Sequence, residues 1–231
     1  MTPEELLAAA RVFHEADLAS SGASPETSRV AAIMGKNFLG ADAWRALGTE
    51  VTPEALPLGL TVELLAGECE LFPGRKVKDT HLLAYLPPDF SLEDLEALSA
   101  DIKGLRNTDW CKGQEGSEFF TKRHPKGEWV LIPKEPLPGS LGLSHAKQDE
   151  LEARYPNYRT STAREFFTAL VLNLAQNNER LYPNSWGWLS DESFVGSRVD
   201  GGGFNINGLG IGCDGVTLQL GRLGRSVSRK F

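Results

Sequence analysis

The chain has 231 residues, of which 41% are hydrophobic and 24% charged, so its composition is that of a globular protein and excludes a disordered chain, a collagen-like repeat or a coiled coil. The formal net charge of -7 disfavours nonspecific nucleic-acid binding, which requires clustered lysine and arginine, so the expected partner is a protein or a small-molecule ligand. No apolar run approaches the roughly 20 residues that span a bilayer, and no secretory leader is visible, so the sequence predicts no membrane span and a cytoplasmic location.

Helices are expected at the beginning of the chain. Thr2 followed by Glu5 fits a capping box, with Pro3 in the first turn. Ser24 before Pro25 marks a second helix start. The first 35 residues are therefore predicted to form a helical pair.

Short strands and one further helix are predicted next. Apolar runs at 61–66 and 81–86 lie between proline and glycine residues, which indicates two short buried strands. Ser91 then opens a helix, because apolar residues recur at helical spacing from Leu92 to Leu105.

Bulky aromatic residues concentrate after Asn107. We therefore expect a domain boundary there, between a helical and short-strand accessory region at 1–107 and a second domain at 108–231. Three tryptophans are expected to be buried in the core: Trp129, Trp186 and Trp188.

Two elements of the second domain are predicted from local signals. Residues 129–133 have the composition of a strand. Thr162 and Glu165 form a capping box in front of a long helix that carries phenylalanine, leucine and valine on one face.

The C-terminal segment 190–231 holds ten of the chain's 24 glycines and cannot form a helix. Apolar residues alternate with polar residues or glycine in three stretches, the last of them at 216–220, which predicts three short strands. Asn207-Gly208 and Asp214-Gly215 lie between these stretches and favour two-residue hairpin turns. An antiparallel β-meander is therefore expected.

The chain contains no convincing catalytic or cofactor motif. Gly210 to Gly215 match G-x-G-x-x-G, but a strand-like sequence follows instead of the helix that a dinucleotide site requires, which favours a glycine-rich hairpin. The four histidines do not stand at metal-ligand spacing, and the three cysteines form no CxxC pair, which favours a reducing compartment. The tail also has oxygen-bearing side chains whose spacing fits no known calcium loop: Asp191, Glu192, Asp200, Asn205 and Asp214. No cofactor, metal site or catalytic residue is predicted.

The tail is depleted in five residue types. Glu, Lys, Gln, Met and Trp occur once between Ser193 and Ser226, as Gln219, although their 39 occurrences in the first 192 residues would give about seven. A glycine-rich meander can avoid long side chains for structural reasons. These five types are also the ones that no codon ending in cytosine encodes, so randomising the first two positions of AAC codons would give the same depletion.

Four tail motifs carry a family resemblance: 186–191, 199–204, 207–209 and 223–231. Together with the depletion, these motifs make the sequence resemble the variable proteins of diversity-generating retroelements. The motifs are also similar to the C-terminal end of C-type lectin folds of the formylglycine-generating-enzyme type. The segments 72–83 and 129–139 also look like parts of bacterial proteins that share this ending, so the resemblance covers about the last two thirds of the chain.

The resemblance implies an α+β protein in which a C-type lectin-like domain, with the meander at its end, follows the N-terminal region. It implies a non-catalytic ligand-binding protein whose variable segment 190–231 presents exchangeable side chains. The framework would be Trp186, Trp188, Phe204, Leu209, Ile211, Gly224 and Arg229. The candidate ligand-binding residues would be Phe194, Gly203, Asn205, Asn207, Asp214, Thr217 and Leu218.

Two other functions remain open at this point. The first is an enzyme or metal-assisted catalyst on the same fold, which would need paired reactive cysteines or a metal cluster near the tail, where Cys213 stands alone in the sequence. The second is a structural or phage-associated interaction module, which would form a stable homo-oligomer through the tail.

Overall fold

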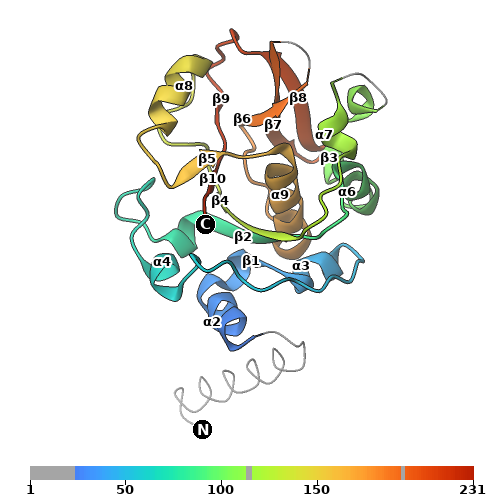
Figure 1. The fold of residues 1–231 in the computed structure, drawn as a ribbon. Helices are drawn as coiled ribbons and strands as arrows, with labels where there is room; N and C mark the ends of the chain where they lie inside the picture. Colours follow the sequence, from blue (N-terminus) through green and yellow to red (C-terminus); the bar gives the residue numbers. More distant parts are fainter. Residues whose placement is uncertain (1–23, 113–115, 194–195) are drawn as a thin grey trace.

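The computed structural model describes residues 24–112, 116–193 and 196–231 and is a mixed α+β fold (Figure 1). The α-helices are α2 (Pro25–Met34), α3 (Ala41–Ala46), α4 (Val62–Ala66), α5 (Val77–Thr80), α6 (Leu92–Leu98), α7 (Glu118–Thr121), α8 (His145–Glu152) and α9 (Ala163–Asn177), and the 3-10 helices are η1 (Gly35–Asn37) and η2 (Asp109–Cys111). The strands are β1 (Phe38–Leu39), β2 (His81–Leu86), β3 (Leu105–Arg106), β4 (Glu128–Pro133), β5 (Tyr158–Thr160), β6 (Trp186–Glu192), β7 (Ser197–Asn205), β8 (Gly208–Gly215), β9 (Leu223–Arg225) and β10 (Val227–Arg229). No helix in these ranges combines the length and the hydropathy that crossing a membrane requires.

The strands pair in three sheets within the described residues. β2 lies between β1, which is parallel to it, and β4, which is antiparallel. The largest sheet has the order β3-β8-β7-β6-β9, and β5 pairs with β10. Helix α9 lies between the β1-β2-β4 sheet and the five-stranded sheet, as Figure 1 shows.

Helix α9 is the centre of the core. Its start follows the predicted capping box, in which the Glu165 N–H donates to Thr162 Oγ1 at 3.2 Å and the Thr162 N–H donates to Glu165 Oε2 at 2.8 Å. Twelve of its 15 residues are buried, so the helix is covered on all sides and not on one face alone. A Cβ atom at Gly201 of β7 would lie 2.6 Å from Phe166, so glycine there lets the sheet approach the helix closely.

Several expectations for the first two thirds of the chain are confirmed. Ser24 caps α2 by accepting a hydrogen bond from the Thr27 N–H, and Ser91 caps α6. β2 and β4 form where strands were expected. The predicted helix at Thr2 lies outside the described residues.

Two expectations in this region are wrong. Residues 61–66 form helix α4 and not a strand, because Thr61 caps it by accepting from the Leu64 N–H at 3.2 Å and the apolar run is too short to reveal its period. Helix α6 ends at Leu98 instead of continuing to Leu105. The backbone turns at Lys103, which has a φ of 53°, and then enters β3.

The tail is a β-hairpin followed by two short strands, so the predicted meander is only partly correct. The turn of the β7–β8 hairpin is Ile206-Asn207 and not Asn207-Gly208, because Asn205 pairs with Gly208 in the register of the two strands; Asn205 Oδ1 also accepts the Asn207 N–H at 2.8 Å. Asp214-Gly215 lies inside β8, opposite Arg198 and Ser197 of β7. Residues 216–220 form a turn and a loop instead of a third strand.

The five-stranded sheet is not purely antiparallel. β6, β7 and β8 are antiparallel to one another, but β3 runs parallel to β8 and β9 runs parallel to β6. The two outer strands therefore arrive through long connections that no local pattern in the tail predicts.

The core continues across the expected domain boundary. β2 and β4 pair with each other from opposite sides of Asn107, and each of the two buried hydrophobic clusters contains residues from both sides. A boundary at this position therefore does not separate two hydrophobic cores.

The tryptophan prediction holds for two of three side chains. Trp188 is fully buried and Trp129 is 7% exposed. Trp186 is only half-buried, because its ring lies over the glycines of β7 and β8 at the wall of a cavity.

Candidate functional site

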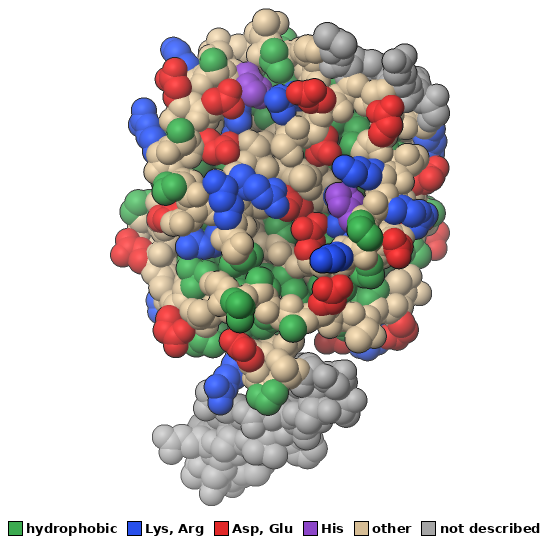
Figure 2. Space-filling model, viewed as in Figure 1, with side chains coloured by type: hydrophobic (Ala, Val, Ile, Leu, Met, Phe, Trp, Pro, Cys, Tyr) green, Lys and Arg blue, Asp and Glu red, His purple; other side chains and the backbone are tan. Residues whose placement is uncertain are grey.

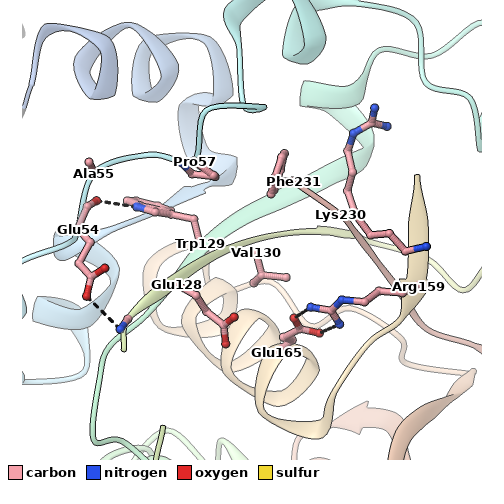
Figure 3. A pocket seen from close by; sticks show the side chains of 12 residues that line it. Glu54, Ala55, Pro57, Glu128, Trp129, Val130, Arg159, Glu165, Lys230 and Phe231 are labelled. Atoms are coloured by element: carbon pink, nitrogen blue, oxygen red, sulfur yellow. Dashed lines mark hydrogen bonds and ion pairs between the residues drawn. The ribbon is translucent and has the colours of Figure 1, made fainter. Parts of the chain in front are cut away.

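Two concave regions of the described surface are candidates for a ligand site. The larger, of about 580 Å³, lies between strand β4, the loop before α4 and the last residues of the chain (Figure 3). Its lining includes Glu54, Trp129, Arg159, Glu165 and Phe231. Basic and acidic side chains are interspersed over the face shown in Figure 2, so this face carries no extended patch of one charge.

The polar groups of this larger cleft are already bonded to one another. Glu165 is buried and accepts two hydrogen bonds from Arg159 and one from Ser228. Glu54 accepts from the Gly127 N–H at 3.1 Å, and Glu128 pairs with Arg164 at 2.7 Å. These bonds hold the capping box, β4 and the chain end together, so we assign the cleft a structural role.

The smaller cavity, of about 160 Å³, lies in the tail itself. It is bordered by β6, β7, β8 and the loop that leads into β9. Its lining residues are Asn107, Trp186, Asp200, Ile211, Gly212, Cys213, Asp214, Leu220, Arg222 and Leu223. We call it the tail cavity.

Asp200 is the unusual residue of the tail cavity. Its side chain is 2% exposed, and its Oδ2 atom has no hydrogen-bond partner among the residues that the structure describes. Burial is the main cause that raises the pKa of Asp200 to about 8; the nearby Asp214 carboxylate contributes to this rise, and Arg222 opposes it. A buried carboxyl group without a bonding partner is destabilising, so it requires an explanation.

The neighbouring strands determine where this carboxyl group points. Asp200 is directly opposite Trp188 on β6 and Gly212 on β8, so the three residues share one face of the sheet. A Cβ atom at Gly212 would overlap Asp200 Oδ1, so glycine provides the space that the carboxyl group occupies. The Nε1 donor of Trp188 is also buried and has no partner in the described part of the chain.

Trp186 and Arg222 form another side of the cavity. The Arg222 guanidinium lies over the Trp186 ring, 5.9 Å from its centroid, and the arginine is exposed. The indole packs over Gly203 and Gly210, where a Cβ atom would come within 3.1 Å and 2.6 Å of it respectively. The cavity thus combines an aromatic wall with two carboxyl groups and one guanidinium.

The predicted ligand-binding residues fall into two groups in the structure. Gly203, Asn205 and Asn207 lie at or near the turn of the β7–β8 hairpin, and both asparagines are exposed. Asp214, Thr217 and Leu218 lie at the other end of β8, and of these only Asp214 lines the tail cavity. Phe194 lies outside the described residues.

Sequence reasoning missed most of the tail cavity. The resemblance assigns Trp186 to the framework, Asp200 was weighed only as one of five oxygen ligands for calcium, and Asn107 and Arg222 had no predicted binding role. One signal was available, since Asp200 is an acidic residue that stands between Val199 and three consecutive glycines. A charge at such a position is either paired or functional.

His81 and Cys111 are two titratable residues that lie buried in the described core. His81 is fully buried, and its two ring nitrogens lie 2.8 Å from Thr80 Oγ1 and 3.0 Å from the Tyr158 hydroxyl. Burial raises the pKa of the Cys111 thiol to about 12, and the nearby Glu96 and Cys213 contribute to the rise. The sequence did not predict that Cys111 and Cys213 lie near each other. Within the ranges that the structure covers, no three His, Cys, Asp or Glu side chains are grouped as a metal site would require.

Comparisons with protein-family models, curated proteins and solved structures find no match for this chain. The fold and the tail cavity therefore carry the functional inference.

Proposed function

We propose that the chain is a non-catalytic ligand-binding protein whose segment 190–231 is a sequence-diversified display surface on a C-type lectin-like scaffold. The observation that supports this most directly is the separation of exposed and buried side chains along the tail. Asn205, Ile206 and Asn207 are exposed, whereas Phe204 before them and Leu209 after them are at most 1% exposed.

This separation would allow side chains to change without loss of the fold. The β7–β8 hairpin is held by main-chain pairing, and glycines fill the positions where strands and helix approach closely. Substitutions at exposed positions away from caps and cores usually change stability by no more than about 0.5 kcal/mol, whereas truncating a buried Leu costs about 2 to 5 kcal/mol. A surface with such a contrast can vary in sequence on one fixed backbone.

The tail cavity adds a recessed site to this surface. It lies where Asp214 and the loop 216–222 meet, and its half-buried Trp186 offers an aromatic wall. Concave sites with a few well-placed polar groups are the usual form of small-ligand sites.

A saturation library over residues 196–226, scored for folding on a cell surface, tests the proposal. We expect tolerance at Asn205, Asn207 and Thr217, and intolerance at Phe204 and Leu209. A matched library over the exposed residues of helix α8 serves as the control for general surface tolerance. Intolerance at the exposed tail positions would contradict the proposal, as would tolerance at the framework positions.

The same library should then be selected against a panel of unrelated proteins and small molecules. The display-surface proposal predicts binders whose substitutions lie in the tail and whose stability stays within about 1 kcal/mol of the parent. If the α8 library yields binders at the same frequency, the tail has no special role in binding and the proposal is contradicted.

A further inference from the structure

The tail cavity has properties that favour one chemical class of ligand. Asp200 is one of its lining residues and is 2% exposed, and the Oδ2 atom of its carboxyl group finds no partner in the described residues. Arg222 also lines the cavity, but its guanidinium lies over the Trp186 ring and forms no ion pair with Asp200 among the described side chains. A group that reaches Asp200 must therefore come from outside the chain.

We propose that the tail cavity binds a primary ammonium group on a short alkyl chain, through an ion pair with Asp200 and contact with the indole of Trp186. This inference rests on the proposed ligand-binding function and names the class of ligand for that surface. The source of the ammonium group is either a free small amine or the end of a lysine side chain on a partner.

The charges of the cavity agree with a monocation. With Asp200 ionised, the lining carries two carboxylates, Asp200 and Asp214, and one guanidinium, Arg222, so one negative charge remains. A single ammonium group neutralises it. Buried charges are stable when they are paired and hydrogen-bonded, and an ammonium group has three donors for the carboxylate oxygens.

The shape of the cavity agrees with a short alkyl chain. Its volume of about 160 Å³ accommodates only a few heavy atoms. Leu220 and Leu223 contribute apolar surface beside the Trp186 ring, and an aromatic face also attracts an ammonium group directly.

Binding of an ammonium group must displace a proton. Since burial raises the pKa of Asp200 to about 8, the carboxyl is mostly protonated at pH 7 and must ionise to form the ion pair. The charged groups that act on it are Asp214 on β8 and Arg222 in the loop before β9. We therefore expect release of close to one proton per ligand at pH 7 and tighter binding as the pH rises to 8.5.

Calorimetric titration of the full chain with n-butylammonium, in buffers of different ionisation enthalpy, tests the proposal. Asp200→Asn should weaken binding at least about tenfold and abolish proton release, because it removes the anionic partner. Glu150→Gln, which changes an exposed carboxylate on helix α8, is the matched control and should leave both unchanged. Circular dichroism of each variant establishes that it is folded.

Two further probes define the ligand. Butyrate and n-butanol have a similar size but lack the positive charge, and both should bind at least about tenfold more weakly than n-butylammonium. Lysine capped at both ends distinguishes the two sources: equal binding indicates a partner's lysine, and loss of binding relative to n-butylammonium indicates a free amine.

Any one of three results would overturn the inference. The parent protein does not bind n-butylammonium, the folded Asp200→Asn variant binds it as tightly as the parent does, or butyrate or butanol binds more tightly than n-butylammonium. Such a result together with the expected tolerance pattern in the tail library would reject the ammonium site and leave the display surface intact. Intolerance of the exposed tail positions with amine binding preserved would reject the display surface alone.

Discussion

Replacing Asp200 by Asn should change how the stability of the protein depends on pH. The folded state raises the pKa of this carboxyl from 3.8 to about 8, mainly through burial. Between these pH values the folded chain keeps a proton that the unfolded chain has released. The stabilising effect of this proton is fully present below about pH 4 and is lost as the pH rises through 8.

The size of the effect follows from the shift. One proton changes the free energy of unfolding by roughly 1.4 kcal/mol per pH unit, so the wild-type protein should lose at most about 6 kcal/mol from this group between pH 4 and 8. Asn cannot titrate, so the free energy of unfolding of Asp200→Asn should lack this dependence on pH. Any change in hydrogen bonding caused by the amide adds an offset that does not depend on pH.

The titration of His81 changes the free energy of unfolding in the opposite direction, at lower pH. Burial lowers its pKa from 6.5 to about 3, so the unfolded chain binds the extra proton between these values and stability rises with pH. In the wild-type protein the contributions of Asp200 and His81 to the pH dependence of the free energy of unfolding should nearly cancel between pH 4 and 6.5. Above pH 6.5 only the Asp200 contribution remains, so the stability should fall. In Asp200→Asn, stability should rise to about pH 6.5 and then level off.

Urea unfolding at pH 4, 5, 6, 7 and 8 and constant ionic strength measures these profiles. Glu150→Gln is the control and should follow the wild-type profile. Parallel profiles for wild type and Asp200→Asn would refute the assignment of Asp200 as a buried, neutral carboxyl at pH 7.

Two further predictions concern packing around the tail. Trp188→Ala should lower the free energy of unfolding by about 3 to 5 kcal/mol because the ring is fully buried, whereas Trp186→Ala should cost less than half as much, and thermal midpoints that fall equally would contradict the difference in burial. Gly212→Ala should destabilise by about 1 to 3 kcal/mol because its Cβ would overlap the Asp200 carboxyl, while Gly221→Ala, which has open space around it, should have little effect in the same urea assay.

Local signals in the sequence predicted the elements that depend on local structure. The capping box at Thr162 and Glu165 and the apolar face behind it located α9, because these interactions form within one helix. β2 was predicted from an apolar run that lies between Pro73-Gly74 and Pro87-Pro88, and in the structure its six residues are all buried.

Elements decided by distant contacts could not be predicted in this way. The run at 61–66 is compatible with either a strand or a helix, and packing of α4 against α2 and the Thr61 cap select the helix. The hairpin turn is set by the pairing of β7 with both β6 and β8, which outweighs the preference of the Asn-Gly dipeptide.

The candidate site depends on distant contacts even more strongly. Asn107 reaches the cavity because β3 pairs with β8, and Arg222 reaches it because β9 adds to β6 in parallel. The sequence shows that the tail is unusual in composition, but it does not show which residues line a cavity.

The most direct test of a diversified tail is to sequence the DNA that encodes residues 190–231 in many cells of a population that descends from one clone. The account predicts a near-identical non-coding copy beside a reverse-transcriptase gene, with adenines at the positions where the two copies differ. It also predicts that variation among cells falls on codons for exposed residues such as Asn205 and Asn207 and spares those for Phe204 and Leu209. Absence of such a copy, together with variation that is uniform along the coding sequence or lacking, would contradict it.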